Sequence, residues 1–148
     1  MFSNHYTHTL DGEGHLNIPA RWREELGPSV VVTRGLDRCL FVFPAEKFER
    51  LARLLERLAF VKSDARTLSR HLFADAETNS PDEQGQISLI SPLREYAGLN
   101  VQATLVGVND HLEIWDPRRY VETDAKIQIE AAAVSERLGE VLQDLLSS

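Results

Sequence analysis

Two short motifs contain residues whose types and spacing could do specific local chemistry. Asp11 lies three residues before Gly14, and Asp82 lies three residues before Gly85. An Asp carboxylate at the first position of a turn accepts hydrogen bonds from backbone N–H groups, and glycine adopts the positive φ that closes the turn. Such turns are typical of three-residue β-hairpin loops with a bulge. The motifs therefore predict two tight hairpins in which both carboxylates have a structural role.

Residues that could support catalysis or bind a metal are sparse. The sequence has no phosphate-binding glycine loop, no nucleophile elbow and no pair of catalytic carboxylates. His5, His8 and His15 could suggest a metal site, but residues three apart on a strand face opposite sides and no nearby cysteine completes a ligand set. The single cysteine, Cys39, lies in an apolar run and is expected to be a small core residue. We therefore predict no enzyme activity, no metal, no cofactor and no small-molecule substrate.

The two motifs belong to an internal repeat with an offset of 71 residues. This length exceeds the short solenoid periods and indicates a duplicated half-domain, which would make the molecule pseudo-twofold. Identical pairs at this offset include Phe2/Phe73, Thr7/Thr78, Asp11/Asp82, Gly14/Gly85, Arg23/Arg94, Glu24/Glu95, Gly27/Gly98 and Val30/Val101.

Composition and charge limit the classes of protein that fit this chain. Its 148 residues are 43% hydrophobic, which is enough for one shared core. No apolar run approaches the roughly 20 residues of a membrane span, so we expect a cytoplasmic protein without a membrane partner. The net charge is −7 and is unevenly distributed: residues 1–72 carry 11 Lys and Arg against 9 Asp and Glu, whereas residues 73–148 carry 5 against 14. A nucleic-acid-binding face is therefore expected in the first half.

Each repeat is predicted to form the same β unit, in which a hairpin leads to a short helix and then to two more strands. Pro19 and Pro92 suit the first turn of the short helices, and Ser91 is expected as an N-cap. Gly27 and Gly98 suit the C-terminal caps. The expected strands are 2–10, 16–18, 30–34 and 39–43 in the first repeat and 87–89, 103–106 and 112–115 in the second.

Helices are predicted after each β unit. Apolar residues recur at helical spacing in Glu46–Leu58, and Leu68 and Leu72 continue this pattern. The basic run from Lys47 to Arg70 is expected to be a solvated helix face or a subunit contact. Near the C-terminus a longer stripe has mostly acidic polar positions, and it could pack on its own domain or on a neighbouring subunit. Its apolar residues are Val134, Leu138, Val141, Leu142 and Leu145.

The paired Asp-x-x-Gly hairpins resemble the swapped-hairpin barrels of AbrB-like transcription factors, and two copies in a chain of this length resemble the MraZ family. The Met1-Phe2 start, the segments 40–44 and 112–116, and Gly107-x-Asn109 support this resemblance. It implies an α+β fold, mainly β, built as a pseudo-twofold swapped-hairpin β-barrel with flanking helices and a C-terminal helix. The expected parts are a first repeat at 5–48, a helical connector at 49–75, a second repeat at 76–119 and a C-terminal helix at 120–148.

The resemblance also implies a function. A member of this family is expected to be a DNA-binding transcriptional regulator that binds short direct repeats in double-stranded DNA, upstream of the bacterial division and cell-wall gene cluster. It is expected to act as a closed, octamer-like ring of identical subunits and to be associated with the nucleoid.

The sequence departs from the family at the position that follows each hairpin turn. Family members typically have an arginine there that reaches DNA, whereas this chain has His15 and Gln86. Arginine is permanently charged and presents a planar fork to phosphate or guanine. A protonated histidine can donate to a phosphate, and glutamine can pair with adenine but carries no charge. Glu13 within the first turn would repel the DNA backbone.

Two hypotheses follow from this departure. In the first, a regulator binds DNA through His15, Arg21, Arg23 and Gln86, with Arg34, Arg38, His5 and His8 as further candidates. In the second, the protein is an oligomeric scaffold of the same fold in which DNA binding is weakened or lost. An alternative role for Arg23 and its repeat equivalent Arg94 is a structural salt bridge with Asp11 and Asp82.

Overall fold

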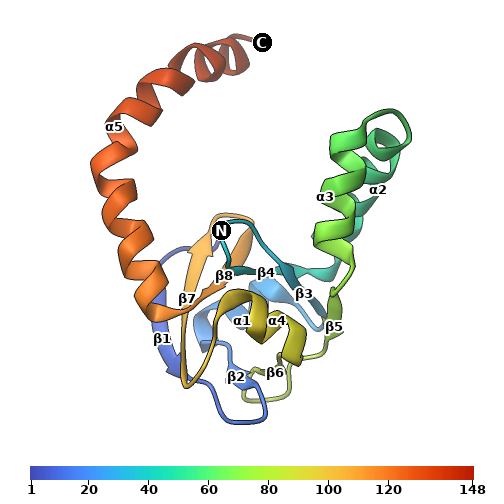
Figure 1. Cartoon of the computed structure of the whole chain (residues 1–148), viewed down its shortest axis with the longest axis vertical. Helices are drawn as coiled ribbons and strands as arrows, with labels where there is room; N and C mark the ends of the chain where they lie inside the picture. Colours follow the sequence, from blue (N-terminus) through green and yellow to red (C-terminus); the bar gives the residue numbers. More distant parts are fainter. The chain divides into compact units, whose positions relative to one another are not determined.

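The computed structural model describes residues 1–148 and contains two compact units, Met1–Pro117 and Arg118–Ser148. Eight strands and four helices lie in the first unit, and one long helix occupies the second (Figure 1). The strands are β1 His5–Thr9, β2 His15–Asn17, β3 Val30–Arg34, β4 Leu40–Pro44, β5 Glu77–Asn79, β6 Gln86–Ser88, β7 Gln102–Val108 and β8 His111–Trp115. The helices are α1 Ala20–Leu26, α2 Ala45–Val61, α3 Ser63–Phe73, α4 Ser91–Ala97 and α5 Pro117–Ser147.

Strands of the two repeats interleave in an antiparallel six-stranded sheet with the order β1-β7-β8-β4-β3-β5. The first strand of each repeat pairs with the third strand of the other, as β1 with β7 and β5 with β3. Exchanging equivalent strands of the two repeats gives the same strand order, read from the opposite edge of the sheet. The equivalent strands β4 and β8 pair at the centre of the sheet. The fold is thus mixed α and β with a mostly antiparallel sheet and a C-terminal helix, which confirms the α+β expectation at this level. The expectation of a mainly β fold was wrong, because more residues lie in the helices than in the strands.

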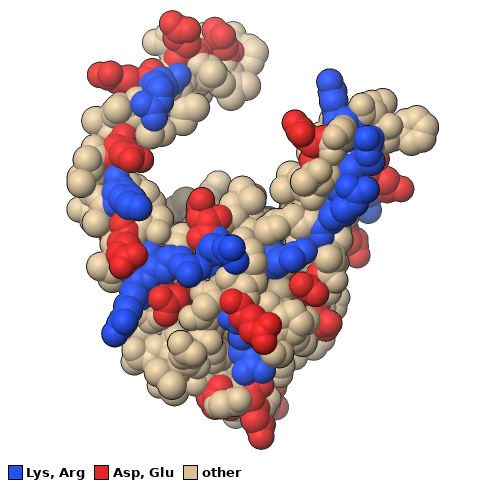
Figure 2. Space-filling model, viewed as in Figure 1, with Lys and Arg blue, Asp and Glu red and all other residues tan.

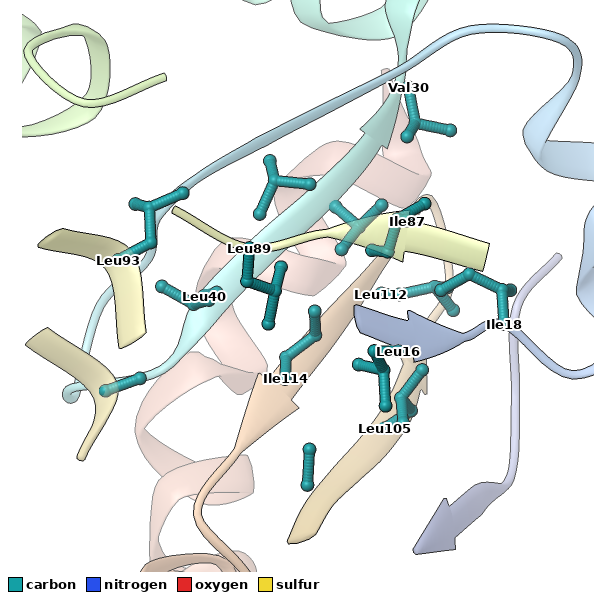
Figure 3. Close-up of a cluster of buried hydrophobic side chains, with 14 of the residues drawn as sticks. Leu16, Ile18, Val30, Leu40, Ile87, Leu89, Leu93, Leu105, Leu112 and Ile114 are labelled. Atoms are coloured by element: carbon teal, nitrogen blue, oxygen red, sulfur yellow. The ribbon is translucent and has the colours of Figure 1, made fainter. Parts of the chain in front are cut away.

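A second, two-stranded sheet pairs β2 with β6 and covers one side of the core. Leu16 and Ile87 alternate with polar neighbours on these short strands, so both side chains point to the interior. They meet Leu105, Leu112 and Ile114 of the large sheet, and all five side chains are almost completely buried (Figure 3). Because the core lies between strands of both repeats, burial of apolar area stabilises the two repeats together.

The starts of the short helices differ in two respects from the prediction. Pro19 is the N-cap of α1 and lies before its first turn. Ser91 is the first residue of α4 and not its N-cap, because the carbonyl of Ile90 already accepts hydrogen bonds from the N–H groups of Leu93 and Arg94, both at 3.1 Å. The expectation that Ser91 caps the helix was therefore wrong by one residue. Glycine ends both short helices, as the repeat predicted.

Helices α2 and α3 form a connector between the repeats. Helix α2 extends beyond the predicted helix Glu46–Leu58 at both ends, and α3 contains the predicted helical residues Leu68 and Leu72. Arg34 at the end of β3 fixes α3, because its guanidinium donates to the carbonyls of His71 at 2.9 Å and Arg70 at 3.2 Å. The adjacent Thr33 hydroxyl donates to the carbonyl of Leu72. Arg34 and Thr33 therefore donate to carbonyl groups in the last turn of this helix.

Helix α5 has 31 residues and no buried residue. Several of its large apolar side chains are exposed and recur at helical spacing. None of the helices is both long enough and apolar enough to cross a membrane.

Candidate nucleic-acid interface

The first hairpin turn is organised by the Asp11 carboxylate. Its Oδ1 accepts hydrogen bonds from the backbone N–H groups of Glu13 at 3.0 Å and His15 at 2.8 Å. The N–H of Gly14 donates to the carbonyl of Asp11, and Gly14 has a φ of 89°. The hydrogen bond from the His15 backbone favours the ionised carboxylate, so the pKa of Asp11 is lowered. This carboxylate therefore stays charged at neutral pH and closes the turn.

The second hairpin has the same geometry. The Oδ1 of Asp82 accepts from the N–H groups of Gln84 at 3.0 Å and Gln86 at 2.9 Å. Gly85 has a φ of 75°, and its N–H donates to the carbonyl of Asp82 at 2.9 Å. Both turns therefore direct the chain into β2 and β6 in the same way.

The two hairpins hold each other through backbone hydrogen bonds. The N–H of Ile18 donates to the carbonyl of Gly85, and the N–H of Leu89 donates to the carbonyl of Gly14, both at 2.8 Å. A methyl group added to Gly14 would lie 2.5 Å from the Leu89 carbonyl oxygen, and one on Gly85 would lie 2.7 Å from that of Ile18. Each turn glycine thus permits the close approach of the opposite hairpin.

This pairing places four polar residues on the outer side of β2 and β6, which we call the ribbon face. His15 lies opposite Ser88 and Asn17 lies opposite Gln86, while Leu16 and Ile87 between them face the core. Because side chains alternate along a strand, all four polar side chains leave the same surface. The structure brings together His15 and Gln86, which the sequence singled out, and adds Asn17 and Ser88. The alternation of the return strands was the signal that could have identified these two.

His15 is held by the acidic groups of its own turn. Its Nδ1 lies 2.8 Å from Asp11 Oδ2 and 3.7 Å from Glu13 Oε2. Since these contacts use Nδ1, Nε2 is the ring nitrogen suited to an external partner. Figure 2 shows acidic side chains gathered at the hairpin end of the first unit, at the bottom of the view. An anionic ligand would therefore approach His15 against the field of two carboxylates.

Arg23 lies against the second hairpin and supports its backbone. Its Nε donates to the carbonyl of Ile18 at 2.8 Å, and its Nη1 donates to the carbonyl of Glu83 at 3.3 Å. A methyl group on Gly85 would lie 2.4 Å from the Arg23 Nε. This guanidinium therefore joins the start of α1 to the tip of the opposite hairpin.

The suggested salt bridges to Asp11 and Asp82 are not formed, since neither Arg23 nor Arg94 pairs with these carboxylates. Both aspartates direct Oδ1 at backbone N–H groups, and Arg23 donates to carbonyl groups instead. Arg94 packs beside Gly14, where its buried Nε has no hydrogen-bond partner.

The other predicted basic candidates lie outside the ribbon face. Arg21 on α1 is exposed and donates to the Tyr6 hydroxyl of β1 at 3.1 Å. Arg34 holds the end of α3, and Arg38 lies over the ring of Tyr96 with its guanidinium carbon 5.3 Å from the ring centre. His5 and His8 lie on β1, which pairs with β7 and not with the ribbon.

Cys39 is buried, and its thiol donates to the carbonyl of Leu36 at 3.0 Å. Burial raises the pKa of the Cys39 thiol, so the reactive thiolate is disfavoured. The structure has no group of three or more His, Cys, Asp or Glu residues placed to hold a metal ion.

Comparison with known proteins identifies the family of this two-repeat arrangement. The family described as "MraZ protein, putative antitoxin-like" matches residues 1–71 and again residues 72–141. The chain is 43% identical to Transcriptional regulator MraZ of Roseiflexus castenholzii over 95% of this chain and 99% of the relative. It is 41% identical to the protein of that name from Moorella thermoacetica, over 93% and 96% of the two chains. The chain is 40% identical to the Desulforamulus reducens protein of that name, over 99% of this chain and 100% of the relative. The chain therefore belongs to the MraZ family.

Proposed function

We propose that this protein is a DNA-binding transcriptional regulator whose ribbon face contacts double-stranded DNA. The observation that carries this proposal is the pairing of β2 with β6, which aligns His15, Asn17, Gln86 and Ser88 on one exposed surface. Amide, hydroxyl and imidazole groups are the types that hydrogen-bond to phosphates and base edges. A two-stranded ribbon also fits the width of the major groove. The relatives' name, Transcriptional regulator MraZ, supports the same role.

We further propose that the fold is a swapped-hairpin β-barrel and that several copies form a closed ring. One ribbon carries few contacts and would bind weakly. A ring that presents several ribbons to short direct repeats would gain affinity through effective concentration. The sites would be the repeats upstream of the division and cell-wall gene cluster, in the nucleoid of the cytoplasm.

A second candidate function is an oligomeric scaffold in which DNA binding has been lost. The contacts of His15 favour it, because Asp11 and Glu13 lie beside the only ionisable group of the ribbon face. Under this alternative the protein keeps its fold and its oligomeric state but does not bind DNA at any pH.

Binding of promoter DNA that carries the direct repeats, measured by fluorescence anisotropy at pH 6 and pH 8 and at fixed low salt, tests the proposal. Tighter binding at pH 6 than at pH 8 would indicate that an imidazole contacts the phosphates. Undetectable binding at both pH values would rule out the regulator and leave the scaffold.

Arginine substitutions locate the contact. His15→Arg and Gln86→Arg should each tighten DNA binding by about tenfold, since one new charged contact contributes roughly 1–3 kcal/mol. Gln102→Arg adds the same charge at an exposed position on β7 and should change the affinity much less. Equal effects of all three variants would indicate general electrostatic attraction and would place the contact elsewhere.

A further inference from the structure

Helix α2 carries an exposed stripe of mixed apolar and basic residues. Leu54, Leu58 and Val61 are 54%, 43% and 69% exposed, which is unusual for three large aliphatic side chains on one helix face. Basic residues share this face at intervals of three and four, so the stripe runs the length of the helix. We call it the α2 stripe, and its residues are Lys47, Arg50, Leu54, Arg57, Leu58 and Val61.

The N-terminal end of the α2 stripe borders a hollow of about 430 Å³. Phe43 and Leu51 give this hollow an apolar lining, and Lys47 and Arg50 provide positive charge. Asp110 and His111 complete its wall. The hollow has the chemistry to accept an apolar side chain from an element that also carries acidic groups.

The charge of the connector supports an acidic occupant. Residues 45–73 contain seven Lys and Arg against four Asp and Glu, a net charge of +3. The acidic residues Glu46, Glu49 and Glu56 of α2 fall at helical positions outside the stripe. Figure 2 shows the basic side chains running along α2 and α3.

The C-terminal half of α5 has the complementary composition. Its apolar positions Leu138, Val141, Leu142 and Leu145 are 49–67% exposed and recur at helical spacing. Residues 131–147 contain one arginine against three acidic residues, a net charge of −2. Residues 131–147 and α2 each span 17 positions, or roughly 25 Å of helix.

We propose that the C-terminal half of α5 from one copy of the chain docks along the α2 stripe of a second copy. An amphipathic helix that lays its apolar residues into a groove is a common mode of recognition, and opposite charges fix its orientation. The two surfaces are different, so the contact is head-to-tail, and repeated contacts of this kind form a ring where the rotation between subunits closes. The inference rests on the oligomer of the proposed function and assigns its interface.

Charge reversal on each surface tests the proposal by molecular mass, measured by analytical ultracentrifugation of the full chain. The α2 variant is Arg50→Glu with Arg57→Glu, and the α5 variant is Glu140→Arg with Asp144→Arg. Each alone should lower the mass to that of the monomer, and all four changes in one chain should restore it. The matched control is Glu49→Arg with Glu56→Arg, which reverses charge on α2 outside the stripe and should leave the mass unchanged. All positions are exposed, and circular dichroism checks that each variant is folded.

Mixing the α2 variant with the α5 variant separates docking between copies from docking within one chain. The mixture contains complementary surfaces only between different chains, so docking between copies predicts recovery of the oligomer. Failure to recover it, an unchanged mass in both variants, or a monomeric unmodified protein would overturn the proposal. Binding of each variant to DNA with a single repeat is measured in parallel. Loss of DNA binding by an intact oligomer would count against the regulator and not against this interface.

Discussion

A methyl group on Gly85 would meet two groups of the opposite half of the molecule, and the backbone of Gly85 adopts a left-handed conformation with a φ of 75°. The nearest group is the Arg23 guanidinium, followed by the carbonyl of Ile18. Gly14 has the corresponding position against Leu89 and Arg94. At the scale of the residue, the hairpins can pair because neither of these two glycines has a side chain that would clash with the opposite hairpin.

Gly85→Ala is therefore expected to lower the free energy of unfolding by about 1–3 kcal/mol, because the methyl group adds a clash to an unfavourable φ. Urea denaturation followed by circular dichroism measures the change. Gly12→Ala is the matched control in the first turn, since no atom lies within 4 Å of the position of its methyl group. Equal stability of the two variants would contradict the close packing described for the hairpins.

His111 makes the stability of the protein depend on pH. Burial disfavours its charged form, but the carboxylates of Glu113 and Asp110 outweigh this effect and raise the pKa of His111 above its ordinary value of 6.5. Its Nδ1 lies 2.8 Å from Asp110 Oδ1, and its Nε2 lies 3.6 Å from Glu113 Oε2. The folded state thus binds this proton more tightly than the unfolded state does. The resulting stabilisation is complete below about pH 6.5 and is lost as pH rises through the folded-state pKa.

The expected result is that His111→Gln removes part of the fall in unfolding free energy between pH 6.5 and pH 8. Urea denaturation at several pH values measures this slope, with His8→Gln as the control histidine on β1. An identical slope in the unmodified protein and in His111→Gln would show that the carboxylates do not hold the proton. Asp110 affects stability in a separate pH range. The hydrogen bond from His111 lowers the pKa of Asp110 below 3.8, so its contribution to the free energy of unfolding is lost only in acid.

At the scale of the element, local sequence patterns predicted the two Asp-x-x-Gly turns because their chemistry depends on neighbours within four residues. The pairing of the strands depends on distant partners, and the local chemistry of the turns does not predict which strands pair. The alternation of the return strands marks Asn17 and Ser88 as outward-facing, but their grouping with His15 and Gln86 on the ribbon face depends on the pairing with the opposite hairpin. Arg23 shows the same limit, because its partner Glu83 lies 60 residues away and is contacted through a carbonyl group.

Arg23→Ala is expected to reduce the free energy of unfolding by about 1–2 kcal/mol, because the carbonyl groups of Ile18 and Glu83 lose their donor. Arg21→Ala, which removes one exposed bond to Tyr6, should have a smaller effect on stability. Thermal unfolding and DNA binding are measured on both variants. Weaker DNA binding by Arg23→Ala at unchanged stability would instead assign this guanidinium to the DNA.

At the scale of the whole molecule, the proposed ring converts several weak ribbons into one strong binding surface. DNA with several correctly spaced repeats should bind about 10²–10⁴-fold more tightly than DNA with a single repeat. Titration of DNA fragments of equal length with one, two or three intact repeats measures this gain. A gain no larger than the number of sites would show that the subunits bind independently.

The pairing of strands from different repeats also affects folding during translation. His5 on β1 pairs with Val106 on β7, so the first strand to leave the ribosome must wait for about 100 further residues before its partner exists. At synthesis rates of about 5–20 residues per second, this delay lasts roughly 5–20 seconds. During this time the first repeat has neither its sheet neighbours nor its half of the core, and its unpaired edges are open to association with other nascent chains. Translation speed across the second repeat therefore sets how long each new chain is exposed to aggregation.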